Sequence, residues 1–145
     1  MSLEGVYDDG NIFAKIIRGE APSVKVYEDG DVLAFMDVFP QARGHLLVIS
    51  KTDKARNLLE ADPAALAKVV AITQKLTRAV TAALKPDGVI VSQFNGAPAG
   101  QTVYHLHFHI IPRWEGTPLG RHAEGMADVE ELTALAAQIS AKLDA

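Results

Sequence analysis

The stretch HLHFHIIPR, residues 105–113, alternates histidine with apolar residues, and this alternation constrains the fold more than any other feature of the chain. In an extended strand, successive side chains point to opposite faces. The pattern therefore predicts His105, His107 and His109 on one face of a strand, with the intervening apolar side chains facing a core. A solvated strand face more usually carries Lys, Thr or Glu. Three of the five histidines of the chain in one row therefore indicate a chemical role.

The rest of the chain predicts an α+β fold with an antiparallel five-stranded sheet, a long helix and terminal helices. The long helix is expected from about Asp62, as N-cap, and Pro63, as first helical residue, to Leu84. Apolar spacing predicts shorter helices at residues 12–17 and 128–143. It predicts a two-stranded hairpin at 24–38 that turns at 28–31, and further strands at 45–50, at 88–94 and in the histidine stretch. Hairpin or meander order suggests an antiparallel sheet with the helices on one side.

Composition excludes several classes of protein. The chain has 145 residues, which suits one domain spanning residues 1–145. Its formal net charge of −4 and the lack of a basic run argue against a nucleic-acid partner. It has no cysteine, so disulfides and thiolate metal sites are excluded, as fits a cytoplasmic protein. No apolar run approaches the ~20 residues of a membrane span, and the first residues lack signal-peptide character, so no membrane partner is expected.

Three interpretations of the histidine row compete. The histidines could be ordinary surface residues, or they could hold a metal with His45 as an additional ligand. The third interpretation is nucleophilic catalysis on phosphorus, in which imidazole forms a phosphoramidate that water then cleaves. The segment before the row favours this chemistry. Small residues at 96–100 could expose backbone N–H groups to a phosphate, and Gln101 and Thr102 add polar donors.

The residues also carry a family resemblance. AGQTVYHLHFHIIPR, residues 99–113, resembles the signature of the histidine triad (HIT) superfamily, and residues 12–51 are similar to the N-terminal half of its Hint-like branch. The resemblance covers a core of about residues 11–115, followed by a C-terminal loop and helix at 116–145. It implies a HIT-like fold whose sheet continues across a homodimer. It also implies a nucleotidyl hydrolase or transferase that cleaves phosphoramidates, mixed anhydrides or dinucleoside polyphosphates at the α-phosphate.

The resemblance further implies a role for individual residues. His107 would be the nucleophile, and His109 would bind the α-phosphate and assist the leaving group. His105 and His45 would support the central imidazole. The remaining residues would contact the nucleotide: Gln101 and Thr102 the phosphate or leaving group, Asp37 the ribose hydroxyls, and Ile12, Phe13, Ile16, Phe35, Val38 and Leu47 the base.

The chain departs from the family pattern in two ways. Some relatives carry Cys-x-x-Cys where this chain has Asn11 and Ala14, and use it to bind structural zinc. We therefore expect no metal and no cofactor here, with His45 free of metal. The position of Phe94 is often Asn or Gln in relatives, and neighbouring Asn95 is a candidate to supply the lost contact. The alternative to an enzyme is a nucleotide-binding regulatory or scaffold protein with vestigial catalysis.

Overall fold

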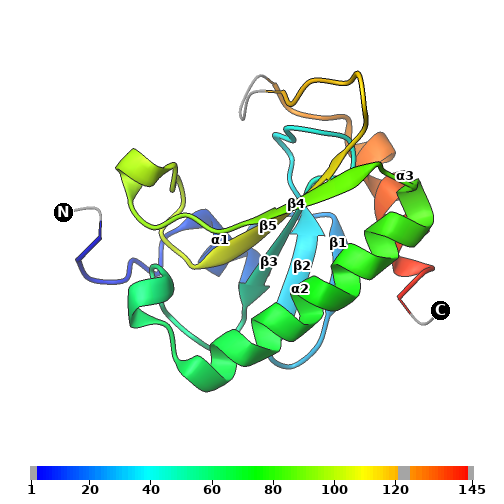
Figure 1. Ribbon diagram of the computed structural model, residues 1–145. Helices are drawn as coiled ribbons and strands as arrows, with labels where there is room; N and C mark the ends of the chain where they lie inside the picture. The colour runs from blue at the N-terminus through cyan, green and yellow to red at the C-terminus, as the bar shows by residue number, and fades with distance from the viewer. Residues whose placement is uncertain (1–2, 121–124, 144–145) are drawn as a thin grey trace.

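The computed structural model describes residues 3–120 and 125–143 (Figure 1). The helices are α1 (Ile12–Ile17), α2 (Pro63–Leu84) and α3 (Val129–Ser140), with two 3₁₀ turns, η1 (Leu58–Glu60) and η2 (Ala97–Ala99). The strands are β1 (Lys25–Glu28), β2 (Val32–Met36), β3 (Leu46–Ser50), β4 (Gly88–Ser92) and β5 (His107–Arg113). The predicted elements are all present, although α3 and β4 end a few residues earlier than expected.

The five strands form one sheet in the order β1-β2-β3-β5-β4, and every neighbouring pair is antiparallel. Asp29 sets the first turn, because its Oδ1 accepts hydrogen bonds from the amides of Asp31 and Val32 at 2.7 and 2.8 Å. The α2 helix begins as predicted, with the Asp62 carboxylate accepting from the Ala65 amide at 3.0 Å. The predicted α+β class and antiparallel five-stranded sheet are confirmed.

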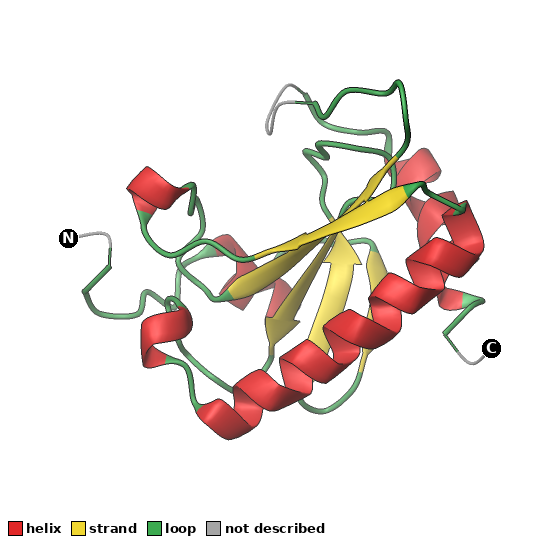
Figure 2. Cartoon of the chain, in the orientation of Figure 1, coloured by secondary structure: helices red, strands yellow, loops and turns green. Residues whose placement is uncertain are grey.

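The helices lie on both faces of the sheet, so the expectation of helices on one side was wrong. The long α2 helix crosses one face, with α3 beside it (Figures 1 and 2). The larger core forms there, and Phe108 and Ile110 of β5 pack into it. On the opposite face, Phe13 and Ile16 of α1 form a smaller core with β2 and β3. The sheet therefore needs apolar side chains on both faces, and α1 covers only part of the second one.

The register between β3 and β5 places the histidines on the α1 face. His107 lies opposite Ile49 and His109 opposite Leu47, and both partners belong to the smaller core. The prediction that His105 shares this strand was wrong, because β5 begins at His107 and His105 lies in a bend before it. The backbone there leaves the sheet, and the Leu106 amide donates to the Ala55 carbonyl at 2.9 Å.

In the described part of the chain, no helix combines the length and the apolar character required to cross a membrane.

Gly44 is where a side chain would most disturb this fold. Its φ is +88°, and a Cβ would lie 2.5 Å from Cδ1 of Leu84 and 3.1 Å from Cγ of Pro112. Gly44→Ala should therefore lower the free energy of unfolding by about 2–4 kcal/mol, from left-handed backbone strain and overpacking together. Gly116→Ala is the control: its φ is +79° with nothing within 4 Å of a Cβ, so only about 1–2 kcal/mol is expected. Urea denaturation of both variants measures this, and equal losses would contradict the packing argument.

Candidate functional site

A cavity of about 540 Å³ opens on the α1 face of the sheet. This volume falls in the range of small-molecule sites, and the wall is mostly apolar. The cavity is lined by all six apolar residues that were predicted to contact a base. Asp37, Thr102, His107 and His109 line it as well. The lining includes Ile12, Phe13, Ile16, Phe35, Val38, Leu47, Asp37, Thr102, His107 and His109. The fold thus gathers segments from both ends of the chain around two of the histidines.

His107 is buried, and its own backbone neighbour fixes its ring. Nδ1 of His107 lies 2.7 Å from the carbonyl oxygen of His105. A carbonyl only accepts hydrogen bonds, so Nδ1 carries the proton. In the neutral imidazole the lone pair then resides on Nε2, the nitrogen that can attack an electrophile. Phe13 packs edge-on against the ring, with centroids 4.9 Å apart. The geometry therefore fixes the tautomer of neutral His107, with the lone pair on Nε2.

His109 and His45 form a directed chain of hydrogen bonds. The Gln41 amide, which only donates, lies 3.1 Å from Nδ1 of His45. In the neutral ring the His45 proton therefore sits on Nε2, which lies 2.9 Å from Nδ1 of His109. This places the proton of neutral His109 on Nε2, where it could form a hydrogen bond to a phosphate oxygen. His45 lies outside the cavity lining, behind His109, and its supporting role is indirect.

Asp37 lies beside this chain, at the end of β2. It is buried, its Oδ1 accepts from the Phe39 amide at 2.8 Å, and its Oδ2 is 3.5 Å from Nε2 of His45. The carboxylate also lines the cavity. A buried carboxylate at the wall can both accept hydrogen bonds from a ligand and stabilise a positive charge on the histidine pair.

Asp37, His45 and His109 could be taken for a metal site, because one ligand atom of each lies within 4.8 Å of the others. The hydrogen bonds argue against this interpretation. Nε2 of His45 would have to lose its proton to bind a metal, while the Gln41 amide already occupies Nδ1 as a donor. A metal would thus require either an imidazolate or the loss of that hydrogen bond. The relatives' zinc position fits no better: Asn11 caps α1 by accepting from the Ala14 amide at 2.9 Å.

His105 lies behind His107 rather than beside it in the cavity. Its Nε2 is 3.0 Å from the Ser50 carbonyl, and its Nδ1 is 2.6 Å from the hydroxyl of Tyr7. Burial lowers the pKa of His105 to about 4, an effect only partly offset by the Ser50 carbonyl. The ring is therefore neutral at physiological pH, and it acts on the site through the carbonyl that holds His107.

Most amides of the loop before the triad are bonded within the loop, so they are not directed at a phosphate as expected. The amides of Ala99 and Gln101 donate to the Gly96 carbonyl, and that of Gly100 to the Ala97 carbonyl. Gln101 is buried, its Oε1 accepts from the Gly96 amide, and its Nε2 donates to the carbonyls of Arg56 and Val103. Gln101 therefore holds the loop and lies outside the cavity lining, whereas Thr102 faces the cavity.

Asn95 also lies outside the cavity lining, contrary to expectation. Its Oδ1 accepts from the Leu58 amide at 2.9 Å, and its side chain is paired with Gln93. These bonds tie the end of β4 to η1. Phe94 instead packs on the site, with its ring centroid 5.2 Å from that of His109. An aromatic contact thus occupies the position where relatives often have an amide.

Several residues of the site escaped the sequence analysis, among them Tyr7, Phe39 and Met126. Phe39 and Met126 line the cavity, Met126 from the C-terminal loop through the hydrogen bond of the Ala127 amide to the Val38 carbonyl at 2.9 Å. None of the three belongs to a periodic segment. The signal that could have identified Phe39 is its position just after Asp37, in the connection between two buried strands.

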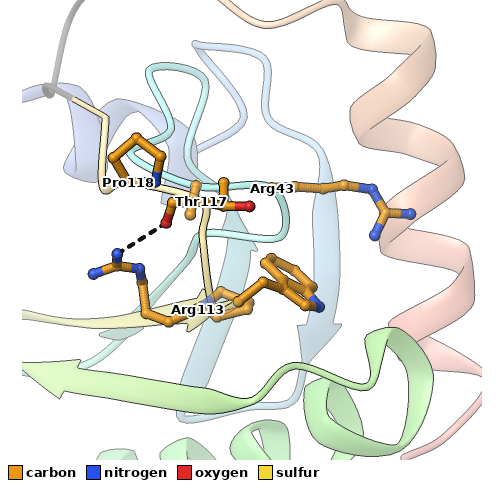
Figure 3. Close-up of a pocket in the computed structure, with 7 residues that line it drawn as sticks. Arg43, Arg113, Thr117 and Pro118 are labelled. Atoms are coloured by element: carbon orange, nitrogen blue, oxygen red, sulfur yellow. Dashed lines mark hydrogen bonds between the residues drawn. The ribbon is translucent and has the colours of Figure 1, made fainter.

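A second hollow, of about 260 Å³, lies at the far end of β5 (Figure 3). It is lined by Ala42, Arg43, Pro112, Arg113, Trp114, Thr117 and Pro118. Two arginines could suggest an anion site, but they point in different directions in Figure 3. Arg113 donates to the Thr117 carbonyl at 3.1 Å. The hollow contains no triad histidine, so the larger cavity is the candidate active site.

Comparisons with known proteins agree with this geometry. A family model described as HIT domain matches residues 18–116. A crystal structure of a Hit-like protein from Bartonella henselae, described as involved in cell-cycle regulation, is 53% identical, has a TM-score of 0.90 and covers 95% of this chain and 99% of that one. Adenosine 5'-monophosphoramidase hnt1 of Schizosaccharomyces pombe is 35% identical over 142 residues, 91% of this chain and 97% of the yeast protein. Adenylylsulfatase HINT3 of Arabidopsis thaliana is 37% identical over 118 residues, 77% of this chain and 59% of the plant protein.

The lowered pKa of His105 predicts a pH dependence of stability. The folded-state value of about 4 lies below the ordinary 6.5, so the unfolded chain takes up this proton first as the pH falls. The stabilisation is therefore present above pH 6.5 and is lost progressively down to pH 4, with roughly 2 kcal/mol lost between pH 7 and 5. His105→Gln should reduce the fall in unfolding free energy over that interval by a similar amount. Urea denaturation at a series of pH values measures the unfolding free energy of both proteins. An equal fall between pH 7 and 5 in the two proteins would exclude this effect.

Proposed function

The chain belongs to the HIT domain family, and from its site we propose that it is a nucleotidyl hydrolase or transferase that releases a nucleoside monophosphate through a nucleotidyl-histidine intermediate. The single observation that carries the proposal is the bond from Nδ1 of His107 to the His105 carbonyl. It leaves the lone pair of a cavity-lining imidazole on Nε2, as a nucleophile requires.

The reaction needs two displacements at phosphorus. Nε2 of His107 forms a bond to the α-phosphorus while the bond from phosphorus to the leaving nitrogen or oxygen breaks. His109, in its protonated form, gives a proton to the leaving group and becomes neutral. Water, or another acceptor, then forms a bond to phosphorus as the P–N bond to His107 breaks. The proton released by the attacking water returns to His109. The His45 chain and the Asp37 carboxylate stabilise the charge that passes through His109.

The proposed substrate is a ribonucleotide whose α-phosphate carries an amine, an acid anhydride or a polyphosphate. The apolar wall around Phe13, Phe35 and Leu47 suits a base, and Asp37 suits the ribose hydroxyls. Two relatives support this range of leaving groups: the fission-yeast protein is named as a phosphoramidase and the plant protein as an adenylylsulfatase. Both names describe adenosine derivatives, which favours a purine nucleotide.

We also propose that the chemistry needs no metal and that the protein is a homodimer. The first proposal rests on the hydrogen-bond chain through Gln41, His45 and His109, which keeps ring protons where a metal would bind. The second rests on β4, which is an edge strand of the described sheet and exposes Val91. Open strand edges pair readily with a second copy, which would continue the sheet.

His107→Asn should abolish turnover of adenosine 5'-phosphoramidate while leaving AMP affinity within about threefold of the unsubstituted protein. Asparagine keeps a polar side chain but cannot form the covalent intermediate, so transition-state stabilisation is lost and ground-state binding is not. Steady-state kinetics and calorimetric AMP titration measure the two effects. Substantial residual turnover would refute the nucleophile. The unsubstituted protein could instead bind AMP tightly and yet be inactive on phosphoramidates, adenylylsulfate and dinucleoside polyphosphates. That result would favour a nucleotide-binding regulator.

Asp37 should discriminate ribose from dideoxyribose. Hydrogen bonds to a carboxylate contribute roughly 1.5–3 kcal/mol each, so 2',3'-dideoxy-AMP should bind at least about tenfold more weakly than AMP. Asp37→Ala should remove most of this difference, because the discriminating acceptor is gone. The ratio of the two affinities is the readout, so a general weakening of the variant cancels. Equal binding of both ligands to the unsubstituted protein would place the ribose elsewhere.

A further inference from the structure

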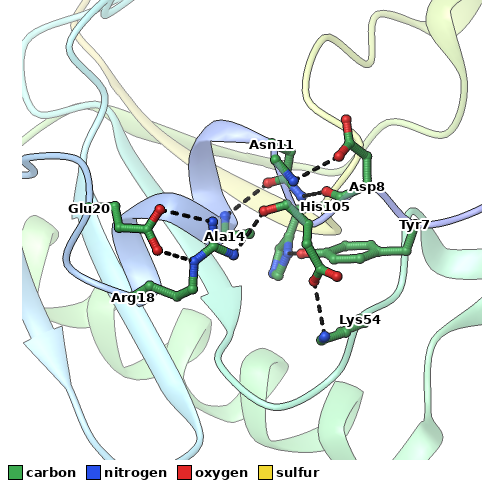
Figure 4. A network of polar contacts seen from close by, with 10 residues as sticks. Tyr7, Asp8, Asn11, Ala14, Arg18, Glu20, Lys54 and His105 are labelled. Carbon is green, nitrogen blue, oxygen red and sulfur yellow. Dashed lines mark hydrogen bonds and ion pairs between the residues drawn. The ribbon is translucent and has the colours of Figure 1, made fainter.

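Tyr7 makes the contact that links the N-terminal segment to the triad. It lies 98 residues from His105 in the sequence, yet its hydroxyl is 2.6 Å from Nδ1 of that histidine. The two rings meet edge to face, with centroids 5.7 Å apart. Figure 4 shows the Tyr7 hydroxyl pointing toward the ring of His105. His107 donates a hydrogen bond to the carbonyl of the same histidine. Two hydrogen bonds, one on each side of His105, therefore connect Tyr7 to the ring of His107.

The direction of these hydrogen bonds follows from the chemistry of the groups. The Ser50 carbonyl can only accept, so Nε2 of His105 donates to it at 3.0 Å. Nδ1 of His105 therefore holds the lone pair and accepts from the Tyr7 hydroxyl. Burial raises the pKa of Tyr7, so the hydroxyl keeps its proton over the working range of pH. Both ring nitrogens of His105 are thus fixed, one by β3 and one by the N-terminal segment.

The same residue supplies the carbonyl that orients the nucleophile. The carbonyl of His105 accepts from Nδ1 of His107 at 2.7 Å, and His105 precedes the first residue of β5. The sheet register therefore does not hold His105 directly. The adjoining amide of Leu106 is bonded to Ala55, and the ring is bonded to Ser50 and Tyr7. The position of this carbonyl depends on these contacts together.

The segment around Tyr7 is tied down on both sides. The side-chain amide of Asn57 donates to the Leu3 carbonyl at 3.0 Å. After Tyr7, Asp9 pairs with Lys54 at 3.0 Å, and its carbonyl accepts from Arg18 at 2.8 Å. These contacts, several of them visible in Figure 4, come from the connection after β3 and from the end of α1. They hold the tyrosine against the site from two directions.

We propose that Tyr7 is a positioning residue for the nucleophilic histidine. Its hydroxyl holds His105 so that the His105 carbonyl keeps the proton of His107 on Nδ1 and directs Nε2 into the cavity. This role rests on the proposed function and extends it, because it assigns to the N-terminal segment a part in catalysis. Tyr7 does not line the cavity, so it should influence the rate rather than the binding of nucleotide.

Tyr7→Phe tests the proposal by removing one oxygen atom. The kcat for adenosine 5'-phosphoramidate should fall by about tenfold, since a small misplacement of a reacting group is costly. KM and AMP affinity should stay within about twofold. Tyr27→Phe is the matched control. Its hydroxyl also makes a 2.6 Å hydrogen bond, to Asp29, but at the β1–β2 turn, so kcat should not change.

A second measurement tests the contact without relying on activity. In nitrogen-15 NMR spectra of the AMP-free protein, the Nδ1 proton of His107 should exchange with water about tenfold faster in Tyr7→Phe, because its acceptor is less firmly held. The His105 Nδ1 resonance should also move. Unchanged His107 exchange, a kcat within twofold of the unsubstituted protein, or parallel losses of kcat and AMP affinity would overturn the proposal. If the unsubstituted protein turns over none of the substrates, the proposed function fails and the exchange measurement alone decides the positioning role.

Discussion

The pairing of β5 with β3 is the constraint on which the site depends. It places His107 opposite Ile49 and His109 opposite Leu47, on the face that α1 only partly covers. A slip of one residue would turn both histidines into the larger core and expose Phe108 and Ile110. Burial of Phe108 and Ile110 under α2 therefore does more than stabilise the sheet. It fixes the register, and the register decides which residues face the cavity.

Backbone groups then give the clustered imidazoles different protonation patterns. The Ser50 and His105 carbonyls each require a proton on the nitrogen they contact, whereas the Gln41 amide requires a lone pair. Chemically identical side chains thus present a lone pair at one position and an N–H at another. Main-chain groups set the tautomers of His105, His107 and His45, and the His45 side chain then sets that of His109.

The sequence was most informative where a side chain's environment follows from a local period. Alternation along β5 predicted the faces of His107, His109 and Phe108. The apolar wall of the cavity was expected only from the family resemblance, because its residues alone indicate a core. The sequence was least informative where pairing is non-local. Gln101 donates to the Arg56 carbonyl and Asn95 accepts from the Leu58 amide, and no period encodes either contact. Tyr7 likewise pairs with a residue 98 positions away. His105 shares the alternating pattern but not the strand, because the tether at Leu106 takes the chain out of the sheet.

The charge balance of the cavity bears on how such a site would work. Among the described residues that line it there is no lysine or arginine, and Asp37 contributes a carboxylate. The negative charge of an α-phosphate would therefore have to be met by imidazole N–H groups, whose protonation the bound anion itself favours. A fixed cation would bind substrate, transition state and monophosphate product alike, and uniform binding does not accelerate a chemical step. His107 can instead gain positive charge as its bond to phosphorus forms and lose that charge when the bond breaks. In the proposed reaction, the apolar wall and the lack of lysine or arginine among the described lining residues would serve the same purpose. The site would be most complementary to a phosphate only while bonds to phosphorus are changing.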